Sequence, residues 1–186
     1  KEDFTPWHLE AAQILCDVLK TKMLLTTEPG LDQSKFLKIL LSDSASFLTK
    51  EKSINALNEQ LKNPGMLLVF PIAANKAERA FANMATDYCK RHFPKSIPVI
   101  HETIFVVLLP NEPNVPFTVL KEYAGQISSF FGQYPIKGGA VYPINDYFNL
   151  NRSYHQALLT ALLNRELDSA GLLFSDDAML EPLYQY

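Results

Sequence analysis

The fold is decided by residues 66–72, which read Met-Leu-Leu-Val-Phe-Pro-Ile. This continuous apolar run follows the turn-forming Asn63-Pro64-Gly65. It has the length of a strand, and it lacks the alternating polar residues of a strand with one solvated face. We therefore expect a central strand that is buried on both faces.

The residues after this strand alternate between helical and extended patterns. Asn75 and Glu78 form a capping box that opens a helix. The apolar positions expected on that helix are Ala77, Phe81, Met84 and Tyr88. Two strands are predicted at 97–100 and 104–109, with a tight connection at His101-Glu102-Thr103.

A second helix and a short strand complete this unit. The apolar residues with helical spacing are Phe117, Leu120, Ala124, Ile127 and Phe131. The strand is predicted at 138–142. The order βαββαβ predicts a ferredoxin-like antiparallel sheet with helices on one face, within the α/β (α+β) class.

Further elements are expected on both sides of the βαββαβ unit. A C-terminal αβα extension comprises a helix, a strand at 172–174, and a last helix that begins at Ser175 or Asp176. The apolar face of the first of these helices is predicted to contain Tyr154, Leu158, Ala161 and Leu162. Two helices precede the unit, one capped by Asp32 and one starting at Thr49. Their apolar positions are Phe36, Leu37, Leu40 and Leu41 in the first, and Ile54, Leu57 and Leu61 in the second.

The N-terminal segment has the pattern of a long helix that starts after Thr5 and ends at the breaker Pro29-Gly30. Its apolar or small residues alternate in steps of four and three, as in a heptad seam. They are Trp7, Ala11, Ile14, Val18, Thr21 and Leu25. We expect residues 1–27 to form a connecting helix with a dimer seam, and 28–186 to form the main domain. Packing of the same stripe on its own domain remains the alternative.

The composition excludes several classes of protein. Net charge is −3, and the Lys and Arg residues are scattered, so a DNA-binding face is not expected in these 186 residues. The two cysteines, Cys16 and Cys89, fit a reducing cytosol. No apolar run approaches the roughly 20 residues of a membrane span. We therefore expect a cytoplasmic protein, and the first residue, Lys1, indicates a piece of a longer chain.

The C-terminal third resembles the CdaR-type GGDEF-like domain of PucR-family transcription regulators. The similar stretches are 150–157 (Leu-Asn-Arg-Ser-Tyr-His-Gln-Ala) and 172–177 (Leu-Leu-Phe-Ser-Asp-Asp), where Phe174 replaces the usual Tyr. Residues 4–10 resemble the entry to the final helix of an upstream GAF-type sensory domain. Residues 36–41 resemble the helix that follows it. AraC-type regulators carry a similar middle domain, so both parent subfamilies remain open.

The resemblance implies a regulatory role. In such regulators a C-terminal helix-turn-helix domain binds DNA, and residue 186 precedes any such segment. We therefore expect a homodimerising domain of a bacterial transcription regulator that relays a signal to that domain. Two-fold proteins read two-fold operators, so dimerisation would orient two DNA-binding domains.

The fold of such domains resembles that of diguanylate cyclases, which need a Gly-Gly-Asp/Glu-Glu-Phe turn. Its glycines let the backbone approach the guanine nucleotide, and its carboxylates hold metal. The corresponding turn here contains His101, Glu102, Thr103, Ile104 and Phe105, without a glycine. The stretch after the first strand, 71–75, contains no acid. We therefore expect no enzymatic activity, no cofactor and no metal. The histidines, His8, His92, His101 and His155, also lack the spacing of a zinc site.

Two alternative functions remain. The first is a small-molecule receptor that reuses the nucleotide cleft, lined by Tyr134, Lys137, His101 and Glu102. The second is an active nucleotide cyclase. Two residue features have ordinary structural interpretations: close packing for Gly138-Gly139, and an inert core thiol for Cys89.

Overall fold

The computed structural model describes residues 33–61, 64–72, 76–112, 115–134, 136–167 and 171–175, without the side chains of 60 and 76–79. Three predictions lie outside the described residues. They are the capping box of Asn75 and Glu78, the last helix after Ser175, and the N-terminal helix. The seam residues Trp7, Ala11, Ile14, Val18 and Leu25 belong to that helix.

Five helices and five strands make up the described part of the chain. Their bounds are α2 Gln33–Leu41, α3 Phe47–Gln60, β1 Pro64–Pro71, α4 Lys76–His92, β2 Ile97–His101, β3 Ile104–Pro110, α5 Phe117–Phe131, β4 Gly138–Val141, α6 Leu150–Glu166 and β5 Leu172–Ser175. The elements from β1 to β4 follow the predicted order along the chain.

The strands form one sheet in the order β2-β3-β1-β4-β5. β1 pairs antiparallel with both β3 and β4, and β2 pairs antiparallel with β3. β5 runs parallel to β4, because α6 returns the chain to the same end of the sheet before β5 begins. The whole sheet is therefore mixed, and the fold is α+β.

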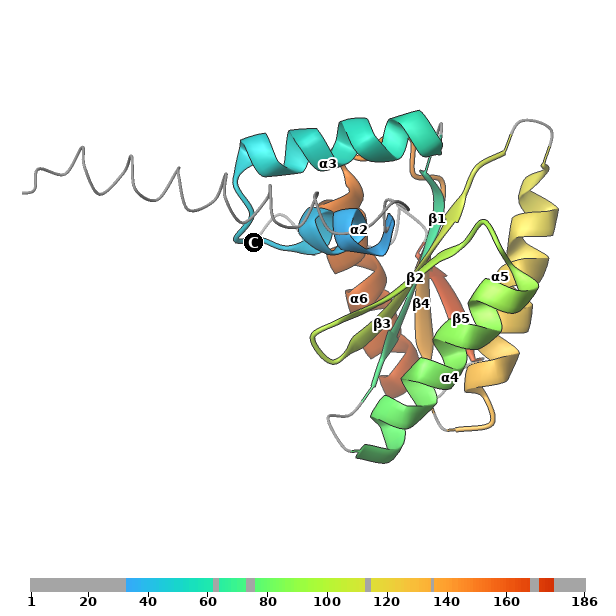
Figure 1. Ribbon diagram of the computed structural model, residues 1–186. Coiled ribbons are helices and arrows are strands. Elements are labelled where there is room, and N and C mark those ends of the chain that lie inside the picture. Colours follow the sequence, from blue (N-terminus) through green and yellow to red (C-terminus); the bar gives the residue numbers. More distant parts are fainter. Residues whose placement is uncertain are drawn as a thin grey trace, which may run out of the picture.

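Helices cover both faces of the sheet, as Figure 1 shows: α4 and α5 lie on one face, and α2, α3 and α6 on the other. Residues 64–70 of β1 are all buried, which confirms the prediction of a central strand. Alternate residues of β1 enter opposite cores. Leu67 and Val69 pack with α2, α3 and α6, whereas Leu68 and Phe70 pack with α4 and α5.

Helix α3 begins earlier than predicted. It starts at Phe47 instead of Thr49, because the hydroxyl of Ser46 caps the helix by accepting a hydrogen bond from the Thr49 amide at 3.3 Å. Ile54 and Leu57 enter the core as expected.

The predicted buried face of α4 is partly wrong. Phe81 is buried, but Met84 is 57% exposed, and the residues that face the core beside Phe81 are Ala82, Ala85 and Cys89. Small residues bring the helix backbone close to the sheet, so Met84 is turned away from the core. In α6, likewise, Tyr154 and Ala161 are buried while Leu162 is 44% exposed.

None of the helices among the described residues has both the length and the apolar character needed to cross a membrane.

Candidate functional site

Polar side chains from three separate segments meet on the α6 side of the sheet. We call this group the hairpin–α6 cluster. Its members come from the α2–α3 loop, the β2–β3 hairpin and the first two turns of α6. They are Asp43, His101, Glu102, Asn151, Tyr154 and His155.

The β2–β3 hairpin has the shortest common loop, with two residues. His101 pairs with Ile104, which leaves Glu102 and Thr103 as the turn. Glu102 has a φ of 55°, in the left-handed region that glycine adopts without strain. The carbonyl of Thr103 accepts a hydrogen bond from the Ile72 amide at 2.9 Å. The turn therefore lies beside the end of β1.

The hairpin also contacts α6. The imidazole of His101 meets the ring of Tyr154 edge to face, with 5.6 Å between centroids. Burial, with smaller contributions from the carboxylates of Glu102 and Asp43, raises the pKa of Tyr154 to about 12. Tyr154 therefore stays neutral well above the pH at which a free tyrosine ionises.

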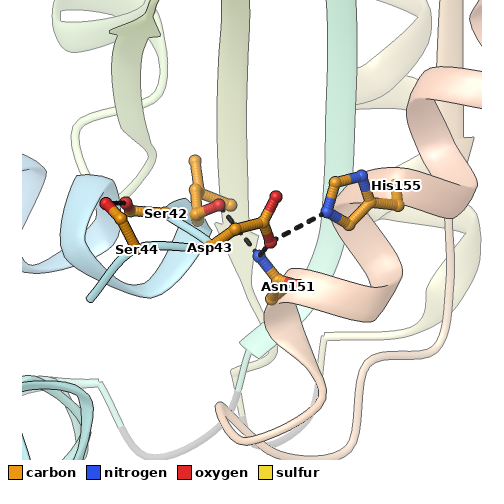
Figure 2. A network of polar contacts seen from close by, with 6 residues as sticks. Ser42, Asp43, Ser44, Asn151 and His155 are labelled. Carbon is orange, nitrogen blue, oxygen red and sulfur yellow. Dashed lines mark hydrogen bonds and ion pairs between the residues drawn. The ribbon is translucent and has the colours of Figure 1, made fainter. Parts of the chain in front are cut away.

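Asp43 joins the α2–α3 loop to α6 (Figure 2). The side-chain amide of Asn151 donates to the Asp43 carboxylate at 3.0 Å and to the Leu41 carbonyl at 2.9 Å. Nε2 of His155 lies 3.2 Å from the same Oδ1 of Asp43. The hydrogen bonds from His155 and Asn151 hold the pKa of Asp43 below its ordinary value, although the carboxyl group is exposed.

Further hydrogen bonds fix the start of α6. The Asp146 carboxylate accepts from the Asn149 amide and from its side chain, both at 2.8 Å. The hydroxyl of Tyr147 donates to the Leu61 carbonyl at 3.2 Å, at the end of α3. The first turn of α6 is therefore connected to the end of α2 through Asn151, and the loop before α6 to the end of α3 through Tyr147.

The remainder of α6 is connected to β4 and to the edge strand β5. Gln156 donates to the Ser175 hydroxyl at 2.7 Å, and Asn164 donates to the Gly138 carbonyl at 2.8 Å. A Cβ on Gly139 would stand 2.1 Å from the Ala157 carbonyl oxygen. This close approach confirms the prediction that the glycine pair serves packing.

The receptor hypothesis placed four residues in one cleft, and the structure separates two of them. Tyr134 packs on Phe81 of α4 at 4.0 Å between ring centroids, whereas His101 contacts Tyr154 on the opposite face of the sheet. These two residues therefore do not line one cleft. Cys89, on α4, points into the core, and burial raises its thiol pKa to about 12, as expected for an inert thiol.

Sequence patterns identified only part of the hairpin–α6 cluster. His101 and Glu102 were singled out by their place in the turn, and the stretch containing Asn151 and His155 by resemblance. The spacing of Asn151 and His155, one helical turn apart, indicates that they share a face of α6. Asp43 was missed because it lies 108 residues from Asn151 in sequence, in a loop without a motif.

Within the described ranges, no three His, Cys, Asp or Glu side chains are grouped in a way that could hold a metal ion.

No protein-family model, curated protein or solved structure shows a significant match to this chain.

Proposed function

We propose that this chain is a non-catalytic regulatory and dimerisation domain of a cytoplasmic bacterial transcription regulator. Its sheet would be a ferredoxin-like core related to the GGDEF-like domains of PucR-family proteins. It would relay a signal from an upstream sensory segment to a helix-turn-helix domain beyond residue 186. The proposal is supported by the resemblance of residues 150–157 and 172–177, and by the geometry of the β2–β3 turn.

The observation that carries the proposal is that this turn is held in place by contacts with β1 and α6. Glu102 occupies a left-handed position that a cyclase fills with glycine, and Thr103 also has a side chain. The turn is held to β1 through the Ile72 amide and to α6 through the His101–Tyr154 contact. A turn with these contacts is suited to transmit movement between strands and helix, and it lacks the glycines that let a backbone approach nucleotide.

The hairpin–α6 cluster supplies a physical route for such a signal. The segment that follows residues 1–32 is α2, whose end leads directly to Asp43. Asp43 is hydrogen-bonded to α6, and α6 is bonded through Gln156 to Ser175, at the end of β5. A displacement of α2 would thus reach the C-terminal end of the described chain through contiguous contacts.

Hydrogen–deuterium exchange on residues 1–186 tests this route. Replacing Asp43 by alanine should speed amide exchange in the first turns of α6, which lose their hydrogen bonds to the α2–α3 loop, and in the hairpin, which contacts α6 through Tyr154. Ser44→Ala, one residue away, serves as the matched control and should change exchange only near the loop. If Asp43→Ala also changes exchange only within the loop, the route is excluded.

Two further experiments test the remaining parts of the proposal. Incubation with GTP and Mg²⁺ or Mn²⁺ should give no cyclic nucleotide, and any product would overturn the non-catalytic assignment.

Light scattering should give a dimer that Val18→Asp dissociates and Gln13→Asp, off the seam, does not. A chain that is monomeric at high concentration, unaffected by Val18→Asp, would exclude dimerisation through this helix.

A further inference from the structure

A cavity of about 250 Å³ opens at the end of the sheet that is opposite to the β2–β3 hairpin. The end of α4, the start of β2, the end of β3 and the start of α5 surround it. The hairpin joins the other ends of β2 and β3. The cavity is therefore separate from the hairpin–α6 cluster and unrelated to the position of the cyclase turn.

The inner wall of the cavity is apolar. Phe93, Leu109 and Leu120 form the buried part, with 6%, 2% and 3% of their surfaces exposed. Two lining residues carry a hydroxyl group: that of Ser96 already donates to the Phe93 carbonyl at 2.7 Å, and Tyr123 is 38% exposed. Every buried side-chain nitrogen or oxygen of the described residues has a partner as well. The interior therefore favours an apolar group that brings no hydrogen-bonding demand of its own.

The size of the cavity limits the ligand. Pockets for drug-sized molecules begin at about 300 Å³, and an apolar cavity of about 150 Å³ is large enough for benzene. A volume of about 250 Å³ lies between these limits and suits one ring with a short substituent. The rings of Phe93 and Tyr123, 5.2 Å apart between centroids, provide an aromatic wall for such a ring.

The mouth of the cavity carries charge. Lys95 and Glu112 form an ion pair there, and His92 lies beside them at the end of α4. An ammonium group has three N–H donors, and Glu112 occupies one of those on Lys95. The other two are available to a ligand oxygen. Lys95 is also 64% exposed, so a ligand reaches it without displacing the core.

We propose that this cavity binds a small monocyclic carboxylic acid, with its ring between Phe93 and Leu120 and its carboxylate on the ammonium of Lys95. The apolar interior holds the ring, and the remaining donors of Lys95 select an anion over a neutral molecule of equal shape. Such a site does not depend on the regulatory role of the hairpin–α6 cluster. It would allow the domain to bind an effector at a place other than the β2–β3 turn.

The test is calorimetric and NMR titration of residues 1–186 with phenylacetate, and with phenylacetamide as its neutral isostere. Phenylacetate should bind at millimolar concentration or below, with chemical-shift changes at Phe93 and Tyr123. The amide should bind about three- to tenfold more weakly, the range expected for a partly exposed charge-assisted hydrogen bond. Lys95→Gln should remove this difference, whereas Lys90→Gln, which lies off the cavity, should preserve it.

A filling variant gives an independent readout. Val115→Trp places a ring in the cavity from the loop before α5, and it should abolish binding of both ligands while the circular dichroism spectrum and melting temperature stay close to those of the parent. The proposal is overturned if phenylacetate does not bind, if the amide binds equally well, or if folded Val115→Trp still binds. Should that variant not fold, Tyr123→Ala, which removes the aromatic wall, must weaken binding of both ligands.

Discussion

At the residue scale, Gly139 fixes how closely β4 approaches α6. An added Cβ would stand 2.1 Å from the Ala157 carbonyl oxygen and 2.5 Å from the Ala161 nitrogen. Both atoms belong to the helix backbone, so the contact is relieved only by moving α6 away from the sheet. We predict that Gly139→Ala lowers the free energy of unfolding by about 1–3 kcal/mol or more, measured by urea denaturation.

Gly125, on α5, provides the matched control. A Cβ built there meets no atom within 4 Å, so alanine introduces no clash. Because alanine has less conformational freedom than glycine in the unfolded chain, Gly125→Ala should raise the free energy of unfolding by about 0.5–1 kcal/mol. Equal effects of the two substitutions would show that the contact with α6 is not what requires glycine at 139.

Asp43 gives a prediction about pH. Its folded pKa is lowered, first by the hydrogen bond from His155 and then by that from Asn151. A lowered pKa means that the carboxylate contributes stability above its unfolded value of 3.8, and that this contribution is lost as pH falls through the folded value. We predict that His155→Ala raises the pKa of Asp43 toward 3.8 and reduces this loss, as measured by carboxyl ¹³C NMR titration.

The control for this titration is His92→Ala. His92 contacts the Tyr88 ring at the end of α4 and is not among the groups that act on Asp43. Its removal should leave the Asp43 titration unchanged. An unchanged Asp43 titration in His155→Ala would instead show that the 3.2 Å contact does not form in solution.

At the element scale, the β2–β3 hairpin carries a local strain that can be measured. A left-handed conformation costs a residue with a side chain roughly 1–2 kcal/mol, and glycine avoids this cost but loses about 0.5–1 kcal/mol in conformational entropy. We predict that Glu102→Gly stabilises the domain by up to about 1 kcal/mol in urea denaturation. Thr103→Gly, at a residue without positive φ, should destabilise it; stabilisation by both would mean that the turn adopts another conformation.

Elements were predictable where one physical signal dominated. The runs that became β1 and β3 are continuously apolar, and both strands are buried along almost their whole length. The four apolar positions predicted for α2 are all buried. The faces of α4 and α6 were predicted less well, because both helices lie close to the sheet through small residues such as Ala82, Ala85 and Ala157. Hydrophobic spacing favours the larger Met84 and Leu162, which the helices expose.

The polar contacts of the hairpin–α6 cluster could be predicted from the sequence only in part. Asn151 and His155 can be placed on one helix face from their spacing, but their partner depends on the position of the α2–α3 loop. That position follows from tertiary packing of α2 against β2 and α6. A sequence without a motif at Asp43 therefore contains no local signal for this contact, whereas the turn at Glu102 is defined by the two strands that flank it.

At the scale of the whole molecule, one sheet separates two cores. Leu37 of α2 lies in the core shared with α3 and α6, and Phe131 of α5 lies in the core shared with α4. Both side chains are 0% exposed. Alternate residues of β1 enter the two cores, so both cores depend on the position of this one strand. Loss of packing on one face of the sheet therefore also weakens packing on the other face.

This arrangement predicts a single cooperative unfolding transition that includes α2. Leu37→Ala should lower the free energy of unfolding by about 2–5 kcal/mol, and Phe131→Ala by about 3–5 kcal/mol. In both variants, circular dichroism and tyrosine fluorescence should report the same urea midpoint, with an unchanged dependence on urea. If α2 were instead an independent arm, Leu37→Ala would lose helical signal early while the main transition kept the midpoint of the parent protein. The size of the Leu37→Ala effect thus measures how strongly α2 is coupled to the sheet. Such coupling is required if a signal is to pass from the N-terminal segment through α2.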